Sequence, residues 1–371
     1  MKRLFLVLLI LLLWATGQVA ADTLKEFPAE KLKKLSLDLS CGGSIEVLGA
    51  KENKVRVEVL FKKTSEKDWE IVYTPRGDEL EVECSSKVKD HHSPDFHIQV
   101  PQKFDLELKT MGGSITISGV NGTITGRTHG GALIFNKLQG DLRMKTMGGD
   151  IELRDSEVDG EVTTMGGRIS IENVVGDIKG HSMGGNVVYR NVRKRQGDNN
   201  GKVVRITTMG GAINVDQAES GAEVETMGGD ITIQSANEYV KAKTMGGDIV
   251  IKSVDGHVKA TTMGGSIKVR ISGDSQGKKD ATLSSLGGGI TLMVPESLAM
   301  DIDIQLVYTK GHQGEYQIHS DFPLQIEEDK EWSHEHGSAR KTIRGRGKIG
   351  DGRNKITITT INGNIALKKS K

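Results

Sequence analysis

Thr110-Met111-Gly112-Gly113 is the first of a series of near-identical tetrapeptides whose spacing decides the fold. The methionine slot of this tetrapeptide recurs every 18 residues in two runs, 111–183 and 209–263, with His129 in the second copy. The step between the two runs is 26 residues, which is one period and eight more. A fixed period of this kind indicates a repeat architecture built from one small unit.

Each period predicts two short strands. The glycine pair is followed by one variable residue and an apolar-x-apolar triplet, such as Ile231-Thr232-Ile233. After a polar stretch, a second alternating run leads to the next threonine, as in Val258-Lys259-Ala260-Thr261-Thr262. Eighteen residues cannot bury a core alone, but stacked copies can bury each other. We therefore expect an all-β protein, a single-stranded parallel β-solenoid (β-helix) with 18-residue coils spaced by about 4.8 Å.

The glycine pairs are expected to form the corner between the two strands of each unit. A tight turn there favours positive φ, which glycine adopts without steric cost. In the last copy, Thr360-Ile361-Asn362-Gly363, asparagine fills the first glycine position, as expected for the next most tolerant residue. A strand follows each pair, whereas a phosphate-binding glycine loop needs a helix. The predicted structural corners are Gly112, Gly113, Gly148, Gly149, Gly166, Gly167, Gly184, Gly185, Gly210, Gly211, Gly228, Gly229, Gly246, Gly247, Gly264 and Gly265.

Residues 1–21 have the features of an export signal. Lys2 and Arg3 precede an apolar run, Leu4–Trp14, and Val19-Ala20-Ala21 is a small-residue cleavage pattern. The apolar run is short for a bilayer span, and no second apolar segment follows it. The mature chain is therefore expected to be soluble and exported, to the periplasm or to the extracellular or cell-surface space.

Composition and charge exclude several classes of function. The chain has 47 glycines, 6 prolines and 4% aromatic residues, while 50 Lys and Arg nearly balance 49 Asp and Glu. This balance, without a basic helix or an aromatic platform, argues against a nucleic-acid partner. No zinc motif, phosphate loop, nucleophile elbow or convergent group of acids and bases is recognisable. No catalytic, cofactor-binding or metal-ligating residue is therefore predicted, and no cofactor.

The chain is expected to be one continuous domain with capped ends. Residues 22–100 would form a strand-rich cap and a first coil, because Ser40-Cys41-Gly42-Gly43 is the repeat tetrapeptide with cysteine in the methionine slot. Residues 101–310 would form the repeat body, and residues 311–371 a second cap with a final coil. Caps are expected because an open solenoid end exposes unpaired strand edges, and the lysine-rich end, 368–371, should discourage further strand addition.

Two polar insertions interrupt the period, near Arg193–Gly201 and Gly273–Lys279. Both are expected to project as exposed loops. Cys41 and Cys84 are the only cysteines, and in an exported protein they form either a disulfide or two buried thiols. The histidines outside the repeats match no metal-ligand spacing; they include His91, His92, His97, His334 and His336.

The methionines of the repeated tetrapeptide should stack into one column, which we name the methionine ladder. Its members are Met111, Met147, Met165, Met183, Met209, Met227, Met245 and Met263. Three interpretations are open: the flexible thioether fills irregular space at the corner, it binds a soft metal such as Cu(I), or it forms an exposed apolar stripe for a partner. The first is favoured, because only His129 adds another ligand type and no cysteine or acidic residue is interleaved.

Three features resemble a known family: the repeated Thr-x-(Gly/Asn)-Gly-x-Ile-x-(Ile/Val/Leu) units, the phrases ending in Val100-Pro101 and Val294-Pro295, and the closing Thr360-Ile361-Asn362-Gly363-Asn364-Ile365. Together they resemble the bacterial "putative adhesin" family of β-strand repeats, a domain class of unknown function. The resemblance implies a right-handed β-helix and a non-catalytic adhesive, envelope-binding or scaffold role. The partner would be a cell-envelope component, a polysaccharide or a protein. A carbohydrate-active β-helix lyase or hydrolase and a periplasmic envelope-stress protein are the alternatives.

Overall fold

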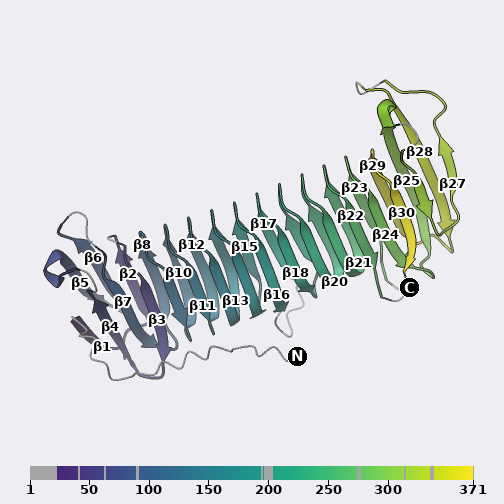
Figure 1. Cartoon of the computed structure of the whole chain (residues 1–371). Helices are drawn as coiled ribbons and strands as arrows, with labels where there is room; N and C mark the ends of the chain where they lie inside the picture. The colour runs from purple at the N-terminus through teal and green to yellow at the C-terminus, as the bar shows by residue number, and fades with distance from the viewer. Residues whose placement is uncertain are drawn as a thin grey trace, which may run out of the picture.

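The chain is all-β, as predicted. The computed structural model describes residues 23–40, 42–61, 64–88, 92–193, 195, 204–273, 277–312, 315–334 and 338–370. Over these residues 30 strands join into one sheet that follows a long rod (Figure 1). The helical segments in this part of the chain are two 3-10 turns, η1 (Glu66–Asp68) and η2 (Lys310–His312).

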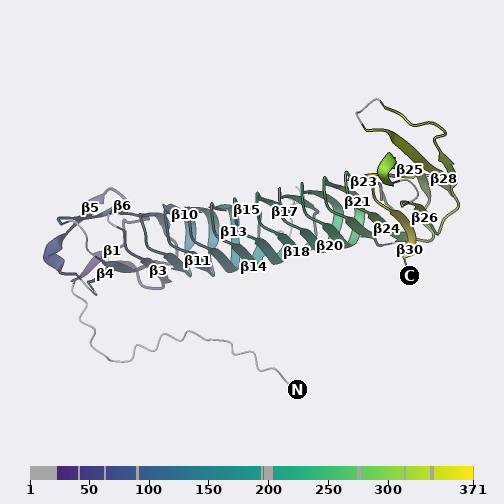
Figure 2. The same cartoon turned by 45° about the horizontal axis from the view of Figure 1, so that its top comes forward.

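Two flat faces run along the rod, as Figure 2 shows from a second direction. The face that leads into each threonine contains, in spatial order, β6 (Glu79–Ser86), β2 (Lys34–Leu39), β8 (Asp105–Thr110), β10 (Asn121–Thr128), β12 (Gln139–Thr146), β15 (Ile178–Ser182), β17 (Val204–Thr208), β19 (Ala222–Glu225), β23 (Ala281–Ser285), β29 (Asn354–Ile361) and β25 (Met300–Thr309). The second face contains β7 (Asp95–Pro101), β3 (Ile45–Ala50), β9 (Ile115–Ser118), β11 (Leu133–Asn136), β14 (Ile169–Val175), β16 (Val187–Arg193), β18 (Ile213–Ala218), β22 (Ile267–Ile271), β24 (Ile290–Pro295), β30 (Ile365–Ser370) and β26 (Ile318–Ser320). Three long strands belong to both faces: β13 (Ile151–Thr164), β20 (Ile231–Lys243) and β21 (Ile249–Thr262).

Successive units lie above one another in register. Neighbouring strands of the repeat body are parallel, and residues 18 apart pair, as Ile151 does with Ile169. Ser182 pairs with Thr208, so the eight extra residues between these units leave the register unchanged. The predicted stacking of the repeated tetrapeptides is confirmed, giving a β-solenoid-like rod; the right-handed winding stays a prediction.

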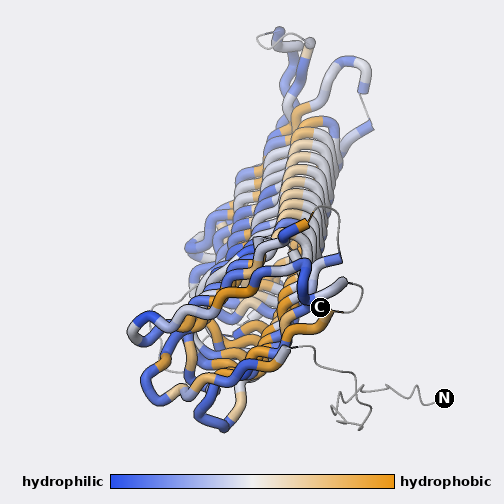
Figure 3. The backbone as a smooth tube through the Cα atoms, turned by 90° about the vertical axis from the view of Figure 1, so that its left-hand side faces the viewer, coloured by the Kyte–Doolittle hydropathy of each residue, from blue (hydrophilic) through white to orange (hydrophobic). Residues whose placement is uncertain are grey.

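Alternation places one side chain of every two in a continuous core. Along β21, Ile249, Val258 and Ala260 are at most 2% exposed, and Thr262 is fully buried, as its place in the alternation predicts. Hydropathy therefore repeats from coil to coil as stripes along the rod (Figure 3). The core also adjusts locally: Gly180 leaves room for Tyr189, whose hydroxyl donates to the Ile178 carbonyl at 2.9 Å.

The glycine corners have a different cause from the one predicted. The predicted corner glycines are not among those with positive φ. The second glycine is required instead because the coil below is too close for a side chain: a Cβ on Gly167 would lie 2.0 Å from the Gly149 carbonyl oxygen. A Cβ on the first glycine, Gly166, would lie at an ordinary 3.5 Å from its nearest neighbour. In the last copy, Asn362 at the first position does adopt positive φ, 52°, as predicted for that corner.

Positive φ occurs at the opposite corner of the coil. There, residues 18 apart adopt the left-handed conformation: Gly119, Lys137, Asp155, Asn173 and Asn191, with φ between 49° and 70°. Their side chains bond from coil to coil, with the Asn191 amide donating to Asn173 at 2.8 Å and the Asn173 amide donating to Asp155 at 2.9 Å. Asparagine and aspartate tolerate this conformation better than most residues, which fits their place here.

The amino-terminal end is a coil covered by antiparallel strands. The predicted first coil is present, since β2 and β3 pair with β8 and β9 of the repeat body. On its outer side β2 pairs with β6 and β3 with β7. β5 (Trp69–Arg76) then pairs antiparallel with β6, while β4 (Lys54–Leu60) pairs antiparallel with β7 and β1 (Thr23–Pro28) with β4.

The last coil in sequence is not the last in space. β29 lies between β23 and β25, and β30 lies between β24 and β26. Lys368 and Lys369 pair with β24 on one side, whereas the pairing of β30 with β26 ends at Leu367, before the lysines. Beyond them, β28 (Arg340–Ile349) pairs antiparallel with β25 and with β27 (Gln325–Glu328), and forms the projecting end of the molecule in Figure 1.

The two insertions differ from each other. Of the first, 194 and 196–203 lie outside the described residues, and the guanidinium of Arg195 pairs with Glu157 at 2.8 Å and Asp159 at 2.9 Å. The second was expected to project as an exposed loop, but its end returns to the rod. Lys279 is 1% exposed, and its ammonium pairs with Asp255 and donates to the Ser272 carbonyl at 2.9 Å.

Candidate functional site

The methionine ladder lies on the outside of the rod. Its eight side chains are between 42% and 52% exposed, so the favoured interpretation as a filler of interior space is wrong. The reason is the alternation of the strand: the threonine before each methionine points inward, and the next side chain points outward. Leu286 fills the same slot in the following coil and is 48% exposed.

Buried hydroxyls fix the position of each ladder residue. The Thr164 hydroxyl donates to the Gly149 carbonyl of the coil below at 2.9 Å and accepts the Gly167 N–H at 3.1 Å. The same pair of bonds recurs at Thr128, Thr146, Ser182, Thr208, Thr226, Thr244 and Thr262. Backbone bonds continue through the ladder itself, with the Met245 N–H donating to the Met227 carbonyl at 3.1 Å.

His129 occupies the ladder slot between Met111 and Met147. Its Nδ1 atom is buried and has no hydrogen-bond partner within the described part of the chain. A buried polar atom without a partner is uncommon and costs free energy. The ladder therefore contains thioethers and one imidazole, with no charged side chain between them.

A shallow hollow of about 330 Å³ lies on the face formed by β15, β17, β19 and β20. Arg205 pairs with Glu223 at 3.2 Å and Lys243 with Glu225 at 2.7 Å, both with exposed side chains. Lys179 and Lys241 also line the hollow, and neither has an ion pair among the described residues. The repeat places these side chains together, because outward positions that are one period apart align.

Next to this hollow, Tyr239 donates to Glu223 at 3.0 Å and stacks on His257 with ring centroids 5.2 Å apart. Burial and the Glu223 carboxylate raise the pKa of Tyr239 to about 12, so the phenol stays protonated at neutral pH. Further along the same face, Lys109 and Lys34 lower the pKa of Glu107 to about 2. Some of the charged groups of this face are thus organised into local pairs.

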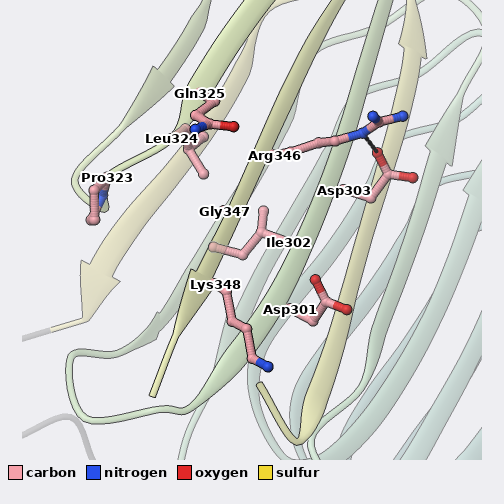
Figure 4. Close-up of a pocket in the computed structure, with 9 residues that line it drawn as sticks. All are labelled: Asp301, Ile302, Asp303, Pro323, Leu324, Gln325, Arg346, Gly347 and Lys348. Atoms are coloured by element: carbon pink, nitrogen blue, oxygen red, sulfur yellow. Dashed lines mark ion pairs between the residues drawn. The ribbon is translucent and has the colours of Figure 1, made fainter. Parts of the chain in front are cut away.

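A second hollow, of about 650 Å³, lies in the carboxyl-terminal cap (Figure 4). Asp301 and Asp303 enter it from β25, and Arg346 and Lys348 from β28. The Arg346 guanidinium lies 3.7 Å from the Asp303 carboxylate. Pro323, Leu324 and Gln325 form the facing wall. The arrangement offers charges of both signs beside an apolar wall, and sequence patterns gave no signal for it because its strands lie outside the strict period.

The two cysteines and the histidines outside the repeats lie only partly within the described residues. Cys84 is 1% exposed on β6, while Cys41 lies outside the described residues, so their disulfide stays a prediction. His91 and His336 also fall outside the described ranges, and His97 lies 3.6 Å from Glu46. Over the described residues, no group of three or more His, Cys, Asp or Glu side chains is placed to hold a metal ion.

The stacked aspartates after the glycine pairs have a backbone role. Asp230 accepts the Asp248 N–H at 2.8 Å, and Asp248 accepts the Ser266 N–H at 2.7 Å. Within the described ranges, no helix has the length and apolarity needed to traverse a bilayer.

Solved structures align with nearly the whole chain, at low sequence identity and low TM-score. A putative cell adhesion protein from Clostridium sporogenes ATCC 15579 is 12% identical, covers 94% of this chain and 98% of its own, and has a TM-score of 0.18. A putative lipid binding protein from Parabacteroides distasonis ATCC 8503 is 12% identical over 94% and 96% of the two chains, with a TM-score of 0.25. A putative adhesin from Bacteroides fragilis NCTC 9343 is 12% identical over 93% and 96%, with a TM-score of 0.18.

No curated protein matches the chain. A family model, Toastrack DUF4097, matches residues 21–368, which span the coils, the methionine ladder and both caps. This match agrees with the resemblance drawn from the repeated tetrapeptides and the Val-Pro phrases. The chain therefore belongs to the Toastrack DUF4097 family, a domain family of unknown function.

Proposed function

We propose that this chain is a non-catalytic, exported protein of the cell envelope that acts as an adhesin-type binding or scaffold module. The rod is the observation that supports this most. Unbroken parallel pairing holds two long faces on which outward side chains repeat at one spacing, and repeat proteins use such extended surfaces for binding. The export signal predicted for residues 1–21 supports placement outside the cytoplasm.

The proposed contact region is the hollow of about 330 Å³ on β15, β17, β19 and β20. Lys179 and Lys241 lack ion pairs among the described residues and are free to meet an acidic group. Arg205 lies between them in the stack and is already paired with Glu223. An acidic polysaccharide of the envelope matches this surface, because Lys179 and Lys241 are three coils apart, about 14 Å, and can meet charges at that distance along one polysaccharide chain.

The test is co-sedimentation of the purified exported chain with isolated envelope fractions: wall sacculi, envelope polysaccharide and lipid vesicles. We expect binding to the polysaccharide-containing fractions, with a several-fold loss in the double variant Lys179→Gln/Lys241→Gln. The matched control is Lys252→Gln/Lys268→Gln, which removes the same charge from the exposed side of the opposite face. Absence of binding to every fraction would refute the proposal.

The same incubations distinguish the alternatives. Release of reducing ends from wall or plant polysaccharides would favour a carbohydrate-active enzyme, and the carboxylates of Asp301 and Asp303 would be its first candidates. Binding without release of reducing ends is the expected outcome. A chain that binds nothing but accumulates under envelope stress would favour the stress-protein alternative.

A further inference from the structure

We propose that the methionine ladder binds soft monovalent metal ions, of which Cu(I) is the type, between the thioethers of neighbouring coils. This inference is independent of the proposed adhesive role, which relies on a different face. It rests on three observations: the exposure of the thioethers, their spacing, and the buried unpartnered nitrogen of His129.

Apolarity alone does not account for the ladder. Leu286 fills the equivalent slot in the next coil with an exposure of 48%, inside the 42% to 52% range of the methionines. The fold therefore accepts leucine at this slot, without any need for sulfur. A contiguous exposed apolar stripe is typical of a surface that binds something. What methionine adds is a thioether, a neutral soft ligand that selects Cu(I) over harder ions.

The spacing of the coils suits a shared ion. Ladder backbones are hydrogen-bonded to one another, and parallel strands repeat at about 4.8 Å. Taking the zinc–thiolate bond as a guide, a metal–sulfur bond is roughly 2.3 Å, so two sulfurs on opposite sides of one ion lie about 4.6 Å apart. Methionines in adjacent coils can therefore hold one ion between them with small side-chain rotations, which their three torsions allow.

The ladder offers an uninterrupted run of such pairs. From Met147 to Met263 seven methionines occupy consecutive coils, because the insertion after Met183 adds no coil. If each ion takes two sulfurs, this run holds about three ions.

His129 provides a mixed site at the other end of the ladder. It lies between Met111 and Met147, and its buried Nδ1 has no partner among the described residues. Imidazole nitrogen is a good ligand for copper, and binding an ion would satisfy this atom. The set of two thioethers and one imidazole would hold about one further ion.

The decisive experiment compares two triple variants that remove equal numbers of sulfurs. Met165→Leu/Met209→Leu/Met245→Leu leaves no adjacent pair within 147–263. Met227→Leu/Met245→Leu/Met263→Leu leaves four consecutive thioethers, from Met147 to Met209. Uptake of Cu(I) is measured on the full exported chain in competition with a coloured Cu(I) chelator, and unfolding midpoints confirm that both variants are folded.

We expect the wild type to take up about four equivalents and the consecutive variant to lose about one of the three in the long run. The alternating variant should lose nearly all uptake in that run. Equal uptake by the two variants would overturn the proposal, because it would make adjacency irrelevant. No uptake by the wild type above that of a protein-free blank would also overturn it. The Met293→Leu variant is the control for a methionine outside the ladder, and it should take up as much Cu(I) as the wild type.

A second readout locates the ions. With methionine methyl groups labelled with carbon-13, titration with Ag(I) should shift the signals of the ladder methionines and leave those of buried Met144 and Met300 in place. A shift of the buried signals alone would refute binding at the ladder. The His129→Leu variant should lose about one equivalent while keeping its unfolding midpoint, and unchanged uptake would remove His129 from the site.

Discussion

A single methyl group added to one corner glycine should damage the stack, whereas the same methyl on its neighbour should not. In Gly167→Ala, the new Cβ would lie 2.0 Å from the Gly149 carbonyl oxygen and 2.4 Å from the carbonyl carbon. Ordinary van der Waals contact begins near 3.4 Å, so the two coils must move apart locally by more than 1 Å to accept the methyl group. In Gly166→Ala the nearest atom is 3.5 Å away, and nothing needs to move.

The cost follows from the bonds that separation would break. The Gly149 carbonyl accepts the Thr164 hydroxyl at 2.9 Å, and the Gly166 N–H donates to the Met147 carbonyl at 3.0 Å. Losing both bonds and overpacking the corner should lower the free energy of unfolding by about 2 to 6 kcal/mol. For Gly166→Ala the expected change is within about 0.5 kcal/mol.

The assay is urea unfolding followed by circular dichroism in the strand band, with hydrogen exchange to locate the damage. Because each coil of a repeat protein contacts only its neighbours, fast exchange in Gly167→Ala should be concentrated in the coils around 147–185. Indistinguishable midpoints for the two variants would refute close backbone approach as the reason for the second glycine.

Three further predictions concern individual contacts. Thr164→Val should lower the free energy of unfolding by about 1 to 3 kcal/mol, because the buried Gly167 N–H and the part-buried Gly149 carbonyl lose their hydroxyl partner. The control is Thr163→Val at the half-buried neighbouring position, which should lose much less stability in the same urea titration. Glu107 has a folded-state pKa of about 2, below its ordinary 4.5, so the stability it contributes is present above about pH 4.5 and lost as pH falls toward 2. Glu107→Gln should flatten this acid limb of the stability–pH curve by less than about 1 kcal/mol, since the group is largely solvated, and an unchanged limb would contradict the assignment. Asp255→Ala should lower the free energy of unfolding by about 1 to 3 kcal/mol, because the buried ammonium of Lys279 keeps only the Ser272 carbonyl as a partner. Lys279→Met removes the buried charge itself and should lower it less. A lower unfolding midpoint for Lys279→Met than for Asp255→Ala would contradict the ion pair.

The strand pairs and their stacking could be predicted from the sequence. An 18-residue repeat, with side chains alternating inward and outward along each strand, allows few registers between neighbouring coils. Once Thr262 is assigned to the interior with Val258 and Ala260, the register of every equivalent residue follows. The same alternation contained the signal that the methionines point outward. That signal was outweighed by the usual association of methionine with protein cores.

Other features depend on which segments meet in space, and a period does not encode this. A glycine required for positive φ and a glycine required for close approach look the same in a sequence, so the corners were located correctly and explained wrongly. The burial of Lys279 depends on Asp255, which belongs to an earlier coil. The insertion of β29 and β30 between earlier strands depends on pairing between residues 75 apart in the sequence, for which local patterns give no signal.

The stacking of the tetrapeptides is tested most directly by distances between spin labels along the ladder. With both native cysteines replaced, pairs of labels join position 147 to positions 227, 245 and 263 in turn. Four, five and six coil steps predict backbone separations near 19, 24 and 29 Å, rising by about 4.8 Å per step even though the insertion adds eight residues to each path. Separations that fail to rise by one strand spacing per coil would contradict the stacked rod.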